Sequence, residues 1–221
     1  MRPLSLFEAT TCLRYIDTAY RNDQRPYIVD NLGVLHVAIS GTDSARDVLK
    51  DLDVRRVPFR YGGKVHAGFE SVYRDVIREV LARAATATEV VVSGHSLGGA
   101  VAGMVALAVA TEFPTMPIRV YTFGAPQAGN GRFKRLFKRR IPESLRVVND
   151  HDPIPQSLSW FYRHLPRKLH LGPNGKRLPA MRSFGRRLVY WLGLVRDTKD
   201  HHVSGYESVV RQAMSRHLDI Y

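Results

Sequence analysis

The chain has 221 residues, 44% hydrophobic and 24% charged, which is typical of one globular domain large enough to bury its own core. Its single cysteine, Cys12, excludes an internal disulfide. The net charge of +13 is uneven, because residues 132–200 hold 17 Lys and Arg against 5 Asp and Glu. This asymmetry favours an anionic partner, with a solvated basic face as the alternative.

The N-terminal residues contain no apolar core of 7–15 residues followed by a small-residue cleavage site. We therefore expect no secretory signal peptide, and a protein that is cytoplasmic or exported by another route. Attachment to the periphery of a membrane is compatible with the basic segment.

Strands and helices are predicted to alternate along the chain. Residues 5–20 carry apolar side chains at helical spacing, and residues 27–29 and 34–39 predict a hairpin. The remaining predicted elements are a helix at 45–52, a strand at 54–59, a helix from 66 to about 85, a strand and a helix within 89–112, a strand at 118–123, a basic helix at 131–140, a strand at 145–148 and a helix at 204–217.

This order predicts an α/β fold: a central, mainly parallel sheet with an antiparallel N-terminal hairpin and helices on both faces. We expect a single domain over residues 1–221, with a basic insertion at about 157–200, where no simple periodicity is found. No internal repeat divides the sequence.

The centre of the pattern is residues 89–112, EVVVSGHSLGGAVAGMVALAVATE. A β-branched apolar run is followed by Gly94-His95-Ser96-Leu97-Gly98 and then by an uncharged helical stretch without proline. This is G-x-S-x-G between a strand and a helix, a nucleophile elbow in which a strained turn raises the serine hydroxyl above the sheet. The glycines interrupt the apolar stretch, and residues 97–110 alone are too short to span a bilayer.

A serine hydroxyl needs a base to take its proton, and the base needs an orienting carboxylate. In elbow hydrolases the carboxylate and then the histidine follow the serine along the chain. Asp150 and Asp152 both lie just after a predicted strand. His201 and His202 precede the last helix, where a loop can present an imidazole. The other downstream histidines are His151, His164, His170 and His217, of which we expect His217 on the surface and His164 and His170 in solvent.

Five blocks, together covering about residues 35–155, resemble the class 3 lipase family, the lineage of the fungal triacylglycerol lipases. Residues 39–42 (ISGT) are similar to its oxyanion strand end, and residues 65–69 (VHAGF) to its V-H-x-G-F block. Residues 94–99 match its elbow, 122–130 resemble its F-G-x-P-R-V-G-N block, and 146–155 resemble R-V-V-N-x-x-D-x-(I/V)-P. The resemblance implies an α/β-hydrolase fold.

The resemblance also implies site residues. It makes Ser96 the nucleophile and Asp152, rather than Asp150, the acid of a catalytic triad. Many members have a histidine in an H-x-x-x-x-Y pattern, which begins here at His201, so we favour His201 over His202 as the base.

For the oxyanion hole the resemblance implies Thr42 together with the backbone N–H of Leu97. Two such donors can lower the barrier by several kcal/mol. Ser40 and the pair Gln127-Ala128 depart from the family pattern, which weakens the inference about substrate class. We expect no cofactor and no metal site. His66 and His95 are expected to be buried, supporting residues.

The basic segment interleaves aromatic and arginine residues, including residues 160–163 (WFYR) and 184–192 (FGRRLVYWL). Such a composition suits a lipid headgroup layer, so one hypothesis makes residues 181–196 a membrane-surface or lid-like element. The alternative is a plain covering of the core. Binding of nucleic acid is the least favoured, because no recognised module surrounds the charges.

The sequence therefore predicts a serine carboxylic-ester hydrolase acting on acylglycerols or similar lipid esters. Hydrolysis of anionic phospholipids, as by a phospholipase A1, is the alternative among enzymes. A membrane- or nucleic-acid-binding protein with a vestigial site is the alternative from another class, and the intact set of candidate residues argues against it. Nothing in the sequence indicates an oligomeric state.

Overall fold

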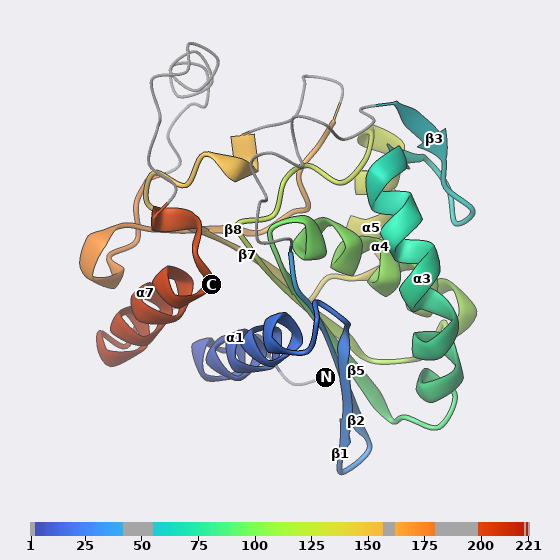
Figure 1. Ribbon diagram of the computed structural model, residues 1–221, viewed down its shortest axis with the longest axis horizontal. Helices are drawn as coiled ribbons and strands as arrows, with labels where there is room; N and C mark the ends of the chain where they lie inside the picture. Colours follow the sequence, from blue (N-terminus) through green and yellow to red (C-terminus); the bar gives the residue numbers. More distant parts are fainter. Residues whose placement is uncertain (1–2, 42–54, 157–161, 180–198, 219, 221) are drawn as a thin grey trace.

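A six-stranded sheet forms the centre of the computed structural model, which describes residues 3–41, 55–156, 162–179, 199–218 and 220 (Figure 1). The strand order is β1-β2-β5-β6-β7-β8. Only β1 and β2 are antiparallel, and every other neighbouring pair is parallel. The predicted sheet type is therefore confirmed. The bounds are β1 Tyr27–Asn31, β2 Val34–Ile39, β5 Glu89–His95, β6 Ile118–Phe123, β7 Ser144–Asn149 and β8 Lys168–Leu171.

Helices cover both faces of the sheet (Figure 1). Side chains alternate along a strand, so Val91 of β5 packs in one core while Val90 and Val92 pack in the other. The first core includes α1 (Leu6–Arg21) and α7 (Val203–Ser215), and the second includes α3 (Ala67–Ala84), α4 (Leu97–Glu112) and α5 (Gly131–Arg140). Strands covered on both sides need apolar residues throughout, which explains the VVV run.

The helix α4 is buried at every position from Leu97 to Ala110. This burial explains why the stretch carries no charge, since an unpaired charge there would lose its hydration. Within the described ranges, no helix has the length and apolarity needed to cross a membrane.

A buried ion pair fixes α1 on the sheet. Arg119 of β6 is 2% exposed, and its guanidinium donates to the Glu8 carboxylate of α1 at 2.7 Å and to Glu89. The Tyr121 hydroxyl also donates to Glu8, at 2.8 Å. A desolvated cation of this kind needs its partners, so these contacts hold the first helix against β5 and β6.

Several elements differ from their predicted limits. The predicted strand at 54–59 is the short β3 (Arg56–Pro58), which pairs with β4 (Lys64–His66) in a separate two-stranded sheet. The final helix α7 ends at Ser215, so His217 lies beyond it and is exposed. The predicted helix at 45–52 lies outside the described residues. The described residues also contain three short 3₁₀ helices: η1 (Ile154–Gln156), η2 (Pro173–Gly175) and η3 (Lys199–His201).

Strand β8 was not identified from the sequence, because it is only four residues long and lies in a basic stretch without clear alternation. It pairs with β7 at the edge of the sheet. His170, which we expected in solvent, lies in β8, is 3% exposed and has its Nε2 2.9 Å from the Asp150 carbonyl oxygen. That expectation was wrong, because the strand buries the imidazole against the neighbouring loop.

Candidate active site

The turn from β5 into α4 has the strained geometry expected of a nucleophile elbow. Ser96 has φ 55° and ψ −128°, values that a residue with a side chain rarely adopts and that cost about 1–3 kcal/mol. The turn is tight enough that a Cβ at Gly94 would lie 2.2 Å from the Gly98 carbonyl oxygen. A Cβ at Gly98 would lie 2.3 Å from the carbonyl oxygens of Ile39 and Ser40. A side chain larger than that of glycine therefore does not fit at either position.

The Ser96 side chain lies where neighbouring strands end. Its N–H donates to the Phe123 carbonyl at 2.9 Å, which ties the elbow to the end of β6. Its hydroxyl is buried and has no hydrogen-bond partner among the described residues. Leu97 is the first residue of α4, so its N–H belongs to the helix end, where donors lack intrahelical partners. On the other side a Cβ at Gly41 would lie 2.7 Å from the Ser96 Cβ.

Asp152 follows β7, and three hydrogen-bond donors surround its carboxylate. Its side chain is 0% exposed. Its Oδ1 accepts the N–H of Ile154 at 2.9 Å, and its Oδ2 accepts the Tyr206 hydroxyl at 2.5 Å. The remaining contact is with the His201 ring, whose Nδ1 lies 3.0 and 2.9 Å from the two oxygens. A buried carboxylate needs such donors to remain ionised.

The His201 ring is oriented by this carboxylate. A carboxylate accepts hydrogen bonds, so the ring donates from Nδ1, and in the neutral imidazole the lone pair is then on Nε2. That Nε2 is buried and has no partner in the part of the chain that the structure describes. His201 is 7% exposed, whereas the neighbouring His202 is exposed. The structure thus brings His201, not His202, to Asp152.

Space for this pair comes from Gly124, the residue after β6. Its φ of 60° is in the left-handed region that favours glycine. A Cβ there would lie 2.8 Å from Asp152 Oδ2 and 3.0 Å from His201 Cε1 and Nδ1. The ends of β5, β6 and β7 are in register, so the elbow, this glycine and the carboxylate loop meet at one edge of the sheet.

Tyr206 is a site residue whose role the sequence did not reveal. It is fully buried in α7, and its hydroxyl lies between Asp152 Oδ2 and the N–H of Asn149, which donates to it at 3.1 Å. Burial and then the charge of Asp152 raise the pKa of the Tyr206 phenol well above its usual range. The phenol therefore stays protonated and acts as a donor. The H-x-x-x-x-Y pattern contained this residue, but not its contact.

Two further histidines are buried, as expected. His66 is 0% exposed, and its Nδ1 accepts the N–H of Gly68 at the start of α3. His95 is 3% exposed, between the Tyr20 hydroxyl and the backbone of His201. Burial, and then the neighbouring imidazole of His201, hold the pKa of His95 well below its usual value. His95 is therefore neutral.

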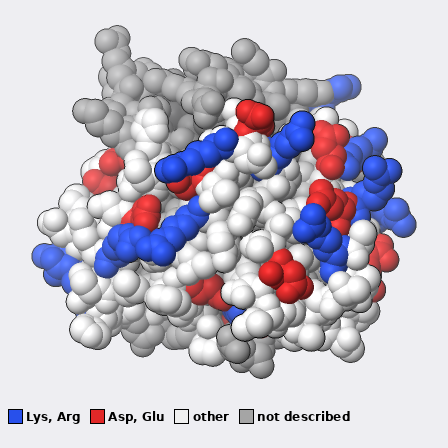
Figure 2. Space-filling view, turned by 60° about the horizontal axis from the view of Figure 1, so that its bottom comes forward, with Lys and Arg blue, Asp and Glu red and all other residues white. Residues whose placement is uncertain are grey.

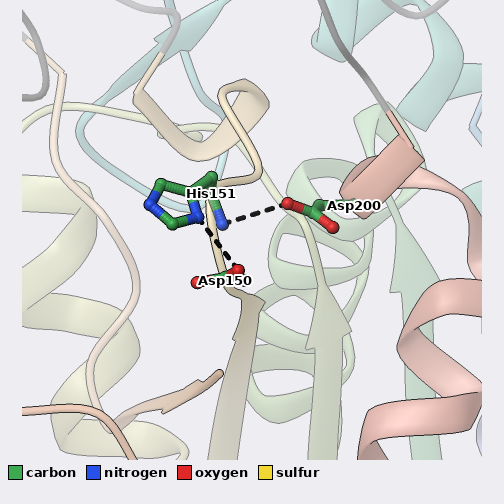
Figure 3. A group of neighbouring side chains, drawn as sticks. All are labelled: Asp150, His151 and Asp200. Carbon is green, nitrogen blue, oxygen red and sulfur yellow. Dashed lines mark hydrogen bonds and ion pairs between the residues drawn. The ribbon is translucent and has the colours of Figure 1, made fainter. Parts of the chain in front are cut away.

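Three neighbouring side chains of types that can ligate a metal, Asp150, His151 and Asp200, lie beside the site (Figure 3). His151 Nδ1 is 2.9 Å from Asp150 Oδ2, and the His151 N–H donates to Asp200 Oδ2 at 3.3 Å. The Asn149 side chain also donates to the Asp200 carbonyl, at 2.9 Å. These contacts join the loop that carries Asp152 to the turn that carries His201, so the group has a structural explanation without a metal.

Two expectations fall outside the described residues. Thr42, expected to supply an oxyanion donor, is one of them, although Gly41 next to it is placed against Ser96. The expected membrane-surface element at 181–196 is the other.

The sequence profile of the family described as "Lipase (class 3)" matches residues 36–161, more than half of the chain. The chain belongs to the class 3 lipase family. The matched range includes the elbow, the strand end at Gly41 and the Asp152 loop, while His201 and Tyr206 lie beyond it.

Two curated relatives each match part of the chain. A secreted mono- and diacylglycerol lipase, MDL2 of Malassezia globosa, is 32% identical over 69% of this chain and 55% of its own length. The chloroplastic phospholipase A(1) DAD1 of Arabidopsis thaliana is 36% identical over 42% of this chain and 24% of its own length. The chain thus spans about half, or less, of the curated relatives it matches.

Solved lipase structures share the fold. The native Rhizomucor miehei lipase propeptide complex superimposes with a TM-score of 0.65 at 20% identity, over 80% of this chain and 72% of that one. At this identity the likeness concerns the fold, which is the α/β-hydrolase fold.

Proposed function

We propose that this class 3 lipase family member is a serine carboxylic-ester hydrolase in which Ser96, His201 and Asp152 form a catalytic triad. The observation that carries the proposal is the buried Asp152–His201 pair. Among the described residues, neither its Nε2 nor the hydroxyl of the strained Ser96 has a hydrogen-bond partner, and both lie at the edge where the strands end. Serine acyl transfer requires a hydroxyl nucleophile with an adjacent general base, and costly backbone conformations of this kind cluster at active sites.

In this mechanism His201 Nε2 takes the proton of Ser96 as the oxygen attacks the ester carbonyl. Asp152 stabilises the resulting imidazolium, which then protonates the leaving alcohol. An acyl-enzyme remains, and water activated by the same imidazole attacks it to release the carboxylic acid. The Tyr206 hydroxyl and the Ile154 N–H keep the carboxylate oriented.

The oxyanion of the tetrahedral intermediate is proposed to rest on the N–H of Leu97 and on Thr42. Support comes from the position of Leu97 at the start of α4 and from the close approach of Gly41 to Ser96. A helix N-terminus also favours negative charge through its dipole.

The proposed substrates are acylglycerols or similar lipid esters. The mono- and diacylglycerol lipase relatives support this class, and the phospholipase A(1) relative supports anionic phospholipids as the alternative. A nonenzymatic protein with a vestigial site is disfavoured, because such a protein has no need to retain both the strain at Ser96 and the buried acid–histidine pair.

Contact with an anionic lipid surface is part of the proposal. The helix α5 has six Lys and Arg and no acidic residue, and it buries Phe133 and Phe137 while most of its cations face outward. Each such cation near an anionic membrane contributes about 1 kcal/mol. Basic and acidic side chains are interspersed on the face drawn in Figure 2, so that face is a poorer candidate for the contact. A nucleic-acid partner is disfavoured.

We also propose that residues 1–221 form one domain in which the basic stretch at about 157–200 is an insertion. The pairing of β8 with β7, and the return of α7 to the core shared with α1, support one domain.

The test is hydrolysis of short- and long-chain p-nitrophenyl esters by the wild type and by Ser96→Ala. We expect the variant to lose at least about 10³-fold in kcat, because the nucleophile is gone. Binding of the wild type to anionic vesicles is measured alongside. A wild type inactive on both esters and on anionic phospholipid vesicles would contradict the proposal.

A further inference from the structure

A chain of hydrogen bonds runs beside the proposed catalytic groups and takes no part in the steps above. It begins at Gly41, whose N–H lies 2.9 Å from the hydroxyl oxygen of Tyr20 in α1. That oxygen lies 2.7 Å from His95 Nδ1. On the other side of the ring, His95 Nε2 lies 2.6 Å from the carbonyl oxygen of His201. Four residues far apart in the sequence are thus joined in one line.

The chemistry of the groups fixes the direction of every bond in this line. A carbonyl oxygen only accepts hydrogen bonds, so the neutral His95 ring has its proton on Nε2 and donates a hydrogen bond from there to the carbonyl oxygen of His201. Nδ1 then has the lone pair, and the Tyr20 O–H must donate to it. The Tyr20 oxygen therefore accepts the Gly41 N–H with a remaining lone pair. Aligned bonds of this kind strengthen one another.

This chain of hydrogen bonds connects two parts of the proposed site whose positions relative to Ser96 matter. Gly41 precedes Thr42 at the proposed oxyanion hole, and His201 is the proposed base. The His95 and His201 rings lie 4.7 Å apart between centroids, with an angle of 34° between their planes. A neutral His95 places no cation against the imidazolium that forms during proton transfer. Tyr20 is itself held in place because α1 is fixed to the sheet by Glu8 and Arg119.

We propose that Tyr20 and His95 are positioning residues, which couple the backbone at Gly41 to the backbone of His201 and so fix the strand end at Gly41 and the base in one relative geometry. This inference rests on the proposed hydrolase function and adds two residues that form no hydrogen bond with Ser96 Oγ or His201 Nε2. Small displacements of catalytic groups reduce the rate strongly, so we expect substitutions of these residues to lower kcat rather than to raise KM.

The first experiment compares Tyr20→Phe with Tyr15→Phe, a matched change on the same helix. Tyr15 is also partly buried and packs on the rings of Tyr27 and His36. Active sites are counted by titration with a fluorophosphonate, and kcat for a soluble short-chain ester is expressed per titrated site. We expect Tyr20→Phe to lower this kcat about tenfold with KM changed less than about twofold, and Tyr15→Phe to leave both within about twofold.

The second experiment uses His95→Gln and His95→Leu. Glutamine keeps a donor at the position of Nε2, so it can still bind the His201 carbonyl, whereas leucine cannot. We expect kcat per titrated site to fall less in His95→Gln than in His95→Leu. The double variant Tyr20→Phe/His95→Leu should be little slower than His95→Leu alone, because both changes break the same line.

Three results would overturn the inference. They are an unchanged kcat per titrated site in Tyr20→Phe, equal losses in the two His95 variants, and losses in the double variant that simply multiply. A structural role alone would lower the fraction of titratable protein instead.

If the wild type hydrolyses no ester, the hydrolase proposal fails, and ¹⁵N spectra of the imidazoles decide the positioning role. The inference then requires a His95 proton on Nε2 and displaced His201 signals in Tyr20→Phe; the other tautomer or unmoved signals refute it.

Discussion

The serine side and the acid–histidine side of the site are built in different ways. The conformation of Ser96 comes from one continuous turn, in which the glycines at 94 and 98 allow β5 to pass directly into α4. Asp152 and His201 are 49 residues apart and are joined by hydrogen bonds between their side chains. The serine side therefore depends on space around the backbone, while the acid–histidine side depends on hydrogen-bond partners.

The largest effect is expected on the side that depends on partners. In Asp152→Asn the amide no longer fixes the proton on His201 Nδ1, so Nε2 is not reliably available as a base. We expect kcat for a short-chain ester to fall about 10⁴-fold. The matched control is Asp150→Asn, because this carboxylate contacts His151 instead. A loss of similar size in the control would mean that the acid has been assigned to the wrong residue.

The need for space around the backbone on the serine side is tested by Gly98→Ala. The added Cβ would meet two carbonyl oxygens at 2.3 Å, and backbone cannot move aside as a flexible side chain can. We expect a loss of about 3 kcal/mol in the free energy of unfolding, measured with urea. Gly131→Ala is the control, since its Cβ would come no closer than 3.5 Å to the end of the Arg135 side chain. If both alanines were tolerated equally, the requirement for space at the elbow would be disproved.

A smaller effect is expected from Tyr206→Phe. This change removes a donor from Asp152 and leaves the Asn149 N–H without its acceptor. We expect about 2 kcal/mol of lost stability and a kcat about tenfold lower, measured by urea unfolding and ester hydrolysis. Tyr162→Phe serves as the control, because this equally buried tyrosine bonds the Arg55 carbonyl. It should lose stability but keep kcat; a parallel loss of kcat would argue against a specific role for Tyr206.

The same contrast explains what could be predicted from the sequence. The elbow could be predicted because its strand, glycines and helix are adjacent in the sequence. The sheet type could be predicted from the alternation of strands and helices. The contacts of Tyr20 and Tyr206 were not readable, because their partners are 75 and 54 residues away and only packing brings them together. Strand β8 was missed because its pairing with β7, not its own pattern, makes it a strand.

The strained backbone of Ser96 has a consequence for how such a chain can change over generations. A glycine at this position would adopt the same conformation without steric conflict, and the protein would gain stability. It would also have no hydroxyl there. A more stable fold would favour glycine at residue 96, whereas the proposed ester hydrolysis requires serine, so the two demands oppose each other at this position.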